Sequence, residues 1–196
     1  MNNKKNSIFA LQNIYKKLMR KLKITELKRL TCEEYKHVSK QNIVVVLDNV
    51  RSLHNVGSVF RTCDAFRIEA LYLCGITSTP PSNEIHKTAI GAEDSVDWKY
   101  FEKTETAVET LISNGYMPIA VEQTDSSILL SDFVSDKNKK YALIFGNEVK
   151  GVQQSVIDLC VATIEIPQFG TKHSLNISVS VGIVVWEVVK NFSLPN

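Results

Sequence analysis

Residues 141–192 read YALIFGNEVKGVQQSVIDLCVATIEIPQFGTKHSLNISVSVGIVVWEVVKNF and carry the strongest pattern in the chain. The apolar run 141–145 ends abruptly in GNE (146–148), and a second run, 162–167, ends in a polar loop that reaches Ser174. Short β-branched and aromatic runs closed by glycine and polar residues are typical of buried strands. Because open α/β sheets bind ligands at the carboxyl ends of their strands, this stretch predicts two ligand-binding loops.

The remainder of the chain alternates apolar strands with amphipathic helices. Strands are expected at 43–47, 68–74, 96–101 and 117–121, and helices at 56–66, at 104–114 and from 149 or 150 to 160. This alternation predicts an α/β domain with a mainly parallel sheet covered by helices on both faces. Residues 75–94 show no clear period, so we expect a long loop there, and 125–140 should be irregular with one short turn.

Residues 174–182 are ambiguous, because they alternate polar and apolar side chains as a half-buried strand does. The continuation, 183–192, is apolar almost all round and predicts a buried helix. Ser174 could equally be the N-cap of one long helix that begins at Leu175. Periodicity leaves both alternatives open.

Composition narrows the class of protein. The 196 residues are 44% hydrophobic and 22% charged, which predicts one main globular domain. No apolar run approaches the roughly 18 residues of a membrane span, and the N-terminus lacks a secretory signal pattern. The four cysteines have no paired CxxC spacing, so we expect buried free thiols in a reducing cytoplasm. The chain also lacks a Gly-rich nucleotide loop, a G-x-S-x-G elbow and a cluster of metal ligands.

The first 40 residues are strongly basic. They hold eleven Lys and Arg against three Glu, a charge of +8, so the remainder carries −6. Apolar residues at helical spacing predict a helix over 7–22, and a second short helix is expected near Thr31. We therefore divide the chain into a basic, mostly helical extension, 1–40, and a main domain, 41–196. The extension suits a polyanion such as RNA, and a solubilising terminus explains its charge equally well.

Three segments, in order, resemble the motifs of one protein family. The segment NVGSVFRTCDAF (55–66) is similar to the first motif of the SpoU/TrmH group of SPOUT RNA methyltransferases. The segment IFGNEVKGV (144–152) resembles the second motif, and Ile166-Pro167 together with SLNISVSVG (174–182) resembles the third. The resemblance extends over about 43–192, and three motifs in the right order make it specific.

The resemblance implies an α/β domain whose C-terminal part forms a deep trefoil knot, normally within a homodimer. In the family the segment after the Ser-Leu-Asn of the third motif is helical, which favours a helix over a strand here. The loops of the knot hold S-adenosylmethionine, and no metal is required. The residues that correspond to its cofactor contacts are Gly146, Asn147, Glu148, Ile166, Leu175 and Ile177.

The resemblance also implies methyl transfer to a ribose 2′-hydroxyl of RNA. This hydroxyl is a poor acid, so it needs a base or a polarising neighbour as well as in-line placement. The family assigns its activation to the arginine of the first motif, here Arg61, although a guanidinium hardly ever deprotonates. A nearby RNA phosphate is our hypothesis for the proton acceptor. Asn55 would orient Arg61 or the RNA backbone, and Glu148 would fix the site by hydrogen bonds. Ser174 and Asn176 would contact the cofactor, the ribose or Arg61 across the dimer.

Without the resemblance, the same residues have ordinary structural interpretations. Arg61 would be a solvated surface charge, Gly146 a tight turn after a strand, and Glu148 an acid at the start of a helix. The side chains at 166, 175 and 177 would belong to the core.

The chain departs from the family pattern at Arg67, which replaces the usual glycine after Ala-Phe and adds a charge near the expected RNA face. The separate RNA-binding domain that is frequent in the family is missing, and the short extension favours tRNA over rRNA as the substrate. We therefore expect a cytoplasmic, S-adenosylmethionine-dependent RNA 2′-O-ribose methyltransferase. The alternatives are a non-catalytic knotted RNA-binding module and a base-methylating enzyme of the same fold.

Overall fold

The computed structural model describes residues 19–190 and 192, and the chain divides into two compact units, Met1–Thr31 and Cys32–Asn196. The described part of the first unit holds the 3-10 helix η1 (Ile24–Glu26) and an exposed ion pair, in which Arg20 and Glu26 approach to 2.6 Å. The helix predicted over 7–22 lies almost entirely outside the described residues. The short helix expected near Thr31 is α2 (Cys32–His37), which belongs to the second unit.

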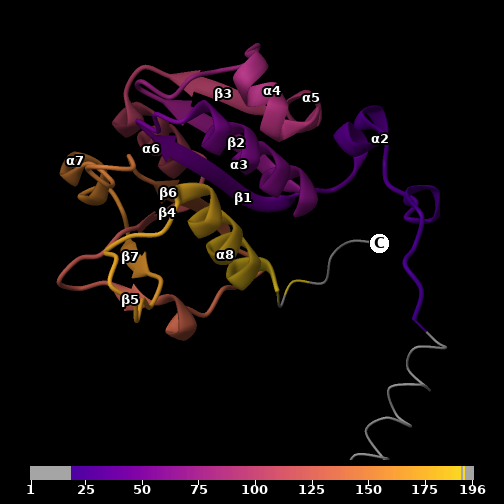
Figure 1. Cartoon of the computed structure of the whole chain (residues 1–196). Coiled ribbons are helices and arrows are strands. Elements are labelled where there is room, and N and C mark those ends of the chain that lie inside the picture. The colour runs from indigo at the N-terminus through magenta and orange to yellow at the C-terminus, as the bar shows by residue number, and fades with distance from the viewer. Residues whose placement is uncertain (1–18, 191, 193–196) are drawn as a thin grey trace, which may run out of the picture. The chain divides into compact units, whose positions relative to one another are not determined.

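A single sheet forms the centre of the second unit, and every strand pair in its described residues is parallel (Figure 1). The order across the sheet is β3-β2-β1-β6-β4-β7-β5. Because parallel strands end on the same side, the loops that follow them gather at one edge. The strands are β1 (Gln41–Asp48), β2 (Ile68–Cys74), β3 (Trp98–Phe101), β4 (Tyr116–Val121), β5 (Ile128–Leu129), β6 (Lys140–Phe145) and β7 (Ala162–Glu165).

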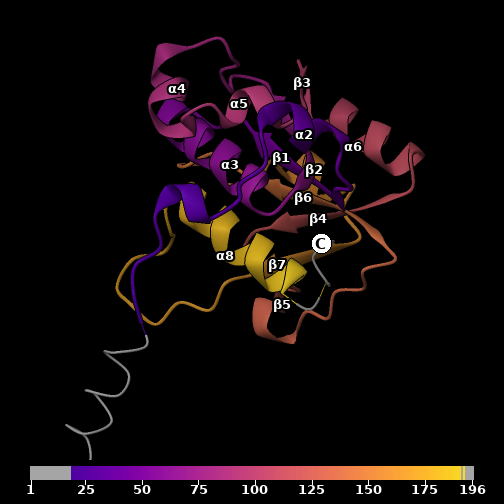
Figure 2. The ribbon, with the colours of Figure 1, turned by 90° about the vertical axis from the view of Figure 1, so that its right-hand side faces the viewer.

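Helices cover both faces of this sheet (Figures 1 and 2). On one face α3 and α8 pack directly on the strands, and α4 and α5 pack against α3. On the other face lie α6 and α7. The predicted α/β architecture with a mainly parallel sheet is therefore confirmed. These helices are α3 (Leu53–Ala65), α4 (Asn83–Ala89), α5 (Ala92–Ser95), α6 (Thr104–Ser113), α7 (Gln154–Ile157) and α8 (Ile177–Val189).

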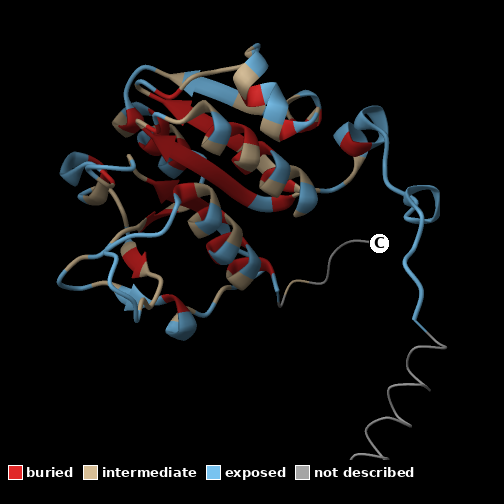
Figure 3. Ribbon diagram, in the orientation of Figure 1, coloured by how far each residue is buried: buried red, intermediate tan, exposed pale blue. Residues whose placement is uncertain are grey.

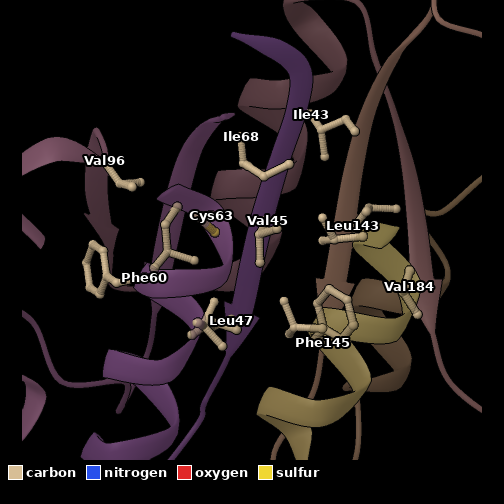
Figure 4. Packing of buried hydrophobic residues seen from close by; sticks show 14 of the residues in the cluster. Ile43, Val45, Leu47, Phe60, Cys63, Ile68, Val96, Leu143, Phe145 and Val184 are labelled. Carbon is tan, nitrogen blue, oxygen red and sulfur yellow. The ribbon is translucent and has the colours of Figure 1, made fainter. Parts of the chain in front are cut away.

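Strand β1 supplies side chains to two separate cores, because successive residues of a strand point to opposite faces. Val45 packs in the core under α3 and α8, whereas Val44 and Val46 pack in the core under α6. Figure 3 shows β1 buried along most of its length, and Figure 4 shows Phe60 of α3 and Val184 of α8 on the same side of the sheet. A strand buried on both faces explains why this segment is a continuous apolar run.

Two expectations about the middle of the chain are wrong. Residues 75–94 are not one long loop, because they contain all of α4 and most of α5. The N-cap of α4 is Ser82, whose hydroxyl accepts a hydrogen bond from the N–H of Ile85, and only Ile85 and Ala89 of this helix are buried. The helix predicted from 149 or 150 to 160 shrinks to the four residues of α7, because residues 147–151 are held in a turn.

The ambiguous segment at the C-terminus is helical, as the resemblance implied, but the helix begins later than predicted. Its N-cap is Asn176 and not Ser174, because the Asn176 side chain accepts a hydrogen bond of 2.9 Å from the N–H of Ser178. Helix α8 is also not buried all round. Val179, Ile183 and Trp186 are 50%, 37% and 56% exposed, and they form an apolar stripe on its outer face, since they lie three to four residues apart.

Arg67, where the family usually has glycine, adopts a left-handed backbone with φ of 50°. It follows Phe66, the C-cap of α3, and its carbonyl accepts a hydrogen bond from the N–H of Gln41 at the start of β1. A side chain in this conformation is strained relative to glycine. The turn from α3 into β2 is therefore made without the residue that suits it best.

Candidate active site

A pocket of about 590 Å³ opens at the edge where β4, β6 and β7 end. Its walls are the loops that follow these strands and the segment that leads into α8. All six residues proposed to bind the cofactor line it. The full lining is Val121, Glu122, Gln123, Phe145, Gly146, Asn147, Glu148, Val149, Lys150, Gly151, Ile164, Glu165, Ile166, Gln168, His173, Ser174, Leu175, Asn176, Ile177 and Ser180.

The loop after β6 is a tight turn that the sequence specifies closely. Asn147 and Gly151 exchange two backbone hydrogen bonds of 3.0 and 2.9 Å, and the Asn147 side chain accepts from the N–H groups of Val149 and Lys150. A Cβ atom on Gly146 would lie 2.0 Å from the carbonyl carbon of Gly151 and 2.1 Å from the nitrogen of Val152. Gly146 is therefore required by the close approach of the chain to itself.

Glu148 joins this turn to the start of α3. Its carboxylate accepts hydrogen bonds from the N–H groups of Arg51 and Ser52, at 3.0 and 3.1 Å, and from the side-chain amide of Asn55 at 3.1 Å. Burial alone would raise the pKa of Glu148, but these three donors and the backbone N–H of Glu148 itself outweigh it and leave the pKa below its ordinary value. Glu148 is consequently ionised at neutral pH and acts as a hydrogen-bond acceptor.

Asn55 connects Glu148 to the N-terminus of α8. Its side-chain oxygen accepts a hydrogen bond of 3.1 Å from the side-chain amide of Asn176. Three of the five residues proposed to be catalytic thus form one chain of hydrogen bonds, Glu148–Asn55–Asn176, although 93 and 121 positions separate Asn55 from the other two. Ser174 is exposed and lines the pocket beside them.

Arg61 lies apart from this group. It is exposed on α3, does not line the pocket, and makes no hydrogen bond or ion pair within the described part of the chain. Asn55, expected to orient Arg61 or the RNA backbone, instead faces Glu148 and Asn176. A single copy of the chain therefore does not bring Arg61 to the pocket.

Two carboxylates that the sequence did not single out help to build the site. Glu122, at the end of β4, lines the pocket and accepts a hydrogen bond of 2.9 Å from the N–H of Val152. Asp48, fully buried at the end of β1, accepts from the hydroxyl of Thr104 at 2.6 Å and from both nitrogens of Gln153 at 2.9 Å. An acidic residue directly after an apolar strand is the only signal that could have identified either one.

The pocket combines apolar walls with polar backbone groups. Phe145, Ile164 and Ile177 are buried beneath it, and Leu175 is 39% exposed at its side. Within the described residues, no backbone N–H from Gln168 to Ser174 donates to another backbone group. Pockets with apolar walls and a few polar groups, of roughly 300–1,000 Å³, are typical of cofactor sites.

The described residues contain no group of three or more His, Cys, Asp or Glu side chains placed to hold a metal ion. In the same part of the chain, every helix is too short or too polar to span a bilayer.

The sequence of this chain is similar to those of known RNA methyltransferases. The model of the SpoU rRNA Methylase family matches residues 42–186. The tRNA (guanosine(18)-2′-O)-methyltransferase of Aquifex aeolicus is 30% identical over 164 residues, which are 82% of this chain and 74% of that protein. The 23S rRNA (guanosine-2′-O-)-methyltransferase RlmB of Neisseria meningitidis is 28% identical over 160 residues, which are 82% of this chain and 63% of that protein.

Solved structures share the fold. The rRNA methyltransferase from Sinorhizobium meliloti with bound AdoMet has a TM-score of 0.73 and 25% identity, over 82% of this chain and 61% of that one. The TrmH/SpoU tRNA modifying enzyme of A. aeolicus has a TM-score of 0.72 and 24% identity, over 81% of this chain and 79% of that one.

Proposed function

Because the chain belongs to the SpoU rRNA methylase family, we propose that it transfers a methyl group from S-adenosylmethionine to a ribose 2′-hydroxyl of RNA. The observation that carries the proposal is the family match over 42–186, which includes every loop of the pocket. The two relatives described above are named as 2′-O-methyltransferases, which supports a ribose rather than a base as the acceptor.

S-adenosylmethionine would supply an electrophilic methyl group on its sulfonium. The residues that would hold it are Gly146, Asn147, Glu148, Ile166, Leu175 and Ile177, all of which line the pocket. Of the segment 168–174, Gln168, His173 and Ser174 line the pocket, and their backbone N–H groups, which donate to no other backbone group within the described residues, suit hydrogen-bond acceptors such as those of an adenine ring. The apolar walls suit the faces of that ring.

The linked hydrogen bonds Glu148–Asn55–Asn176 would keep the site in one geometry. Glu148 is ionised and its oxygens already accept three hydrogen bonds, so it is better suited to positioning than to removing a proton. Fixed polar groups lower a reaction barrier because they need no rearrangement as the reaction proceeds. In this proposal Asn176 and Ser174 face the cofactor or the ribose.

We further propose that a homodimer completes the site. The apolar stripe of α8, formed by Val179, Ile183 and Trp186, supports this, since exposed apolar patches of this kind commonly mark protein interfaces. Trp186 also lies against Phe66 at the end of α3, with ring centroids 6.1 Å apart. A second copy covering this surface would lie close to α3, which carries Arg61. In the proposal Arg61 holds the ribose and an RNA phosphate in place at the pocket of that second copy.

Other parts of the proposal extend to the fold and the setting. We infer that the C-terminal part forms the trefoil knot implied by the family, and that the protein acts in the cytoplasm. Residues 1–40 would form a basic extension that contacts RNA, and 41–196 the methyltransferase domain. We favour tRNA over rRNA, because the A. aeolicus relative is named as a tRNA enzyme and is matched over more of its length than RlmB.

The test is methyl transfer from labelled S-adenosylmethionine to separated tRNA and rRNA taken from cells that lack the protein. We expect label in tRNA, within a nuclease-resistant dinucleotide that marks a ribose 2′-O-methyl group. Label on a base would instead identify a base-methylating enzyme. Cofactor binding without label in either RNA would favour a non-catalytic RNA-binding module and refute the proposal.

A further inference from the structure

A second hollow lies at the same edge of the sheet, next to the proposed active site. It is bounded by the start of α3, by the loop that follows β2 and by the edge strand β3. None of its residues belongs to the three segments that resemble the family motifs, and none lines the cofactor pocket. The residues that line it are Leu53, Gly75, Thr77, Ser78, Thr79, Ser82, Trp98 and Tyr100.

Two aromatic rings, those of Trp98 and Tyr100, line the hollow. Tyr100 is 50% exposed, although its hydroxyl donates a hydrogen bond of 3.0 Å to the carbonyl of Gly75 and so fixes the ring. Trp98 packs against the core but is only half-buried. An exposed tyrosine that is held in place costs little further entropy when a flat ligand stacks on it.

Free hydroxyl groups lie beside these rings. The side chains of Ser78 and Thr79 make no hydrogen bond within the described residues, whereas the neighbouring Thr77 is fully engaged and buried. Each free hydroxyl can donate or accept. A planar group with both donors and acceptors on its edge therefore fits the hollow better than a purely apolar one.

The hollow is structurally continuous with the Glu148 site. The hydroxyl of Thr77 accepts a hydrogen bond of 2.9 Å from the N–H of Val50. The next two residues, Arg51 and Ser52, donate their N–H groups to Glu148, and the one after them, Leu53, lines the hollow. One short segment, 50–53, thus has the proposed active site on one side and the aromatic hollow on the other.

We propose that this hollow binds an unstacked nucleobase of the RNA substrate, from a nucleotide that flanks the methylated one. The inference rests on the proposed function, which places the target ribose at the pocket that Glu148 lines. Proteins recognise single-stranded RNA mainly by stacking splayed bases on aromatic rings and by hydrogen bonds to the edges of the bases. The hollow offers both kinds of contact where the strand would continue past the target ribose.

Tryptophan fluorescence tests the contact directly, because Trp98 and Trp186 are the two tryptophans of the chain. Titration of the full-length protein with unmethylated tRNA should quench the emission of Trp98, so the quench should be larger in wild type than in Trp98→Phe. If the quench is the same in wild type and Trp98→Phe, no base stacks in the hollow and the inference is overturned.

Methyl-transfer kinetics provide a second test with a matched pair of variants. Tyr100→Leu removes the aromatic face from an exposed position and should raise KM for tRNA roughly five- to hundredfold, with kcat and cofactor affinity unchanged. Tyr100→Phe keeps the aromatic face but loses the hydrogen bond to Gly75 that holds the ring, so its KM should rise less than that of Tyr100→Leu. A wild-type KM for Tyr100→Leu would refute the inference while leaving methyl transfer intact. If wild type transfers no methyl group yet shows the Trp98 quench, the proposed function fails and the hollow remains an RNA site.

Discussion

Replacing Glu148 with glutamine separates the charge of this side chain from its shape. The carboxylate accepts from Arg51 N–H through one oxygen, and from Ser52 N–H and Asn55 through the other. Glutamine has one acceptor oxygen, so its amide nitrogen would face an N–H group on one side. We expect the oxygen to keep the pair of donors and the Arg51 bond to be lost.

The size of the effect follows from that single bond. A hydrogen bond to a charged group contributes roughly 1.5–3 kcal/mol, and the partial exposure of Glu148 reduces this to about 1–2 kcal/mol. For a chain of this length, such a loss should lower the melting temperature by roughly 2–8 °C. Activity should fall further, because Asn55 and Asn176 are held through the same carboxylate.

The pH dependence gives the assay its specificity. The pKa of Glu148 is lower in the folded chain than its ordinary value of 4.5. Its stabilisation is therefore complete above about pH 4.5 and is lost as the pH falls through the folded-state pKa. Urea unfolding at fixed protein concentration should show a difference in stability between wild type and Glu148→Gln that is constant from pH 7 to about pH 5 and narrows as the pH falls further, through the folded-state pKa.

A matched control is Glu109→Gln on α6, an exposed glutamate whose side chain makes no hydrogen bond within the described residues. Its stability should equal that of wild type at every pH. Equal stability of Glu148→Gln and wild type at pH 7, or a gap that does not narrow in acid, would refute this account of Glu148.

Four further predictions test other parts of the site. Gly146→Ala forces a Cβ atom against Gly151, which should lower the free energy of unfolding by about 1–3 kcal/mol and weaken cofactor binding. Gly170→Ala, whose Cβ atom meets no atom within 4 Å, should change neither, and equal cofactor affinities of the two variants in calorimetric titration would contradict the close approach at Gly146. Arg61→Ala should leave the circular dichroism spectrum unchanged and reduce methyl transfer by roughly 100-fold or more, and near-normal transfer would remove Arg61 from the catalytic proposal. Trp186→Glu places a charge in the apolar stripe of α8 and should convert a dimer into monomers by light scattering; a wild-type mass would argue against this surface as the interface. Deletion of residues 1–31, which keeps α2 and its buried Tyr35, should weaken RNA binding and flatten its dependence on salt, and an unchanged slope would mean that these residues do not contact RNA.

Most strands were predictable because each is a largely apolar run closed by polar residues or glycine, but β5, of two residues, lies in 125–140, where an irregular segment was expected. β2 has the predicted bounds, and β1 and β6 differ from prediction by at most two residues. Helix α4 was missed because it buries only two of its seven side chains, too few to create a helical period. The start of α8 was misplaced because polar and apolar residues happen to alternate there. The helical period is clear only from Ile177 onward, through Val181, Val184 and Val188.

The candidate site was predictable only in part, for a different physical reason. The pocket lining followed from the motifs, but the hydrogen bonds that organise it connect residues far apart in the sequence. Asp48 and Gln153 are 105 positions apart, and Glu122 and Val152 are 30 apart. No local pattern encodes such pairs, since each partner is an ordinary polar residue until the fold brings the two together.

The pairing of β1 with β6 also has a consequence for how the protein is made. Ile43 lies opposite Tyr141, 98 positions later in the chain. At roughly 5–20 residues per second, a ribosome needs about 5–20 s to add that many residues. Throughout this interval β1, which is buried along most of its length in the folded sheet, has one unpaired edge, a template for association with other nascent chains. The interior position of β1 in the sheet therefore makes the protein depend on whatever shields that edge until β6 is synthesised.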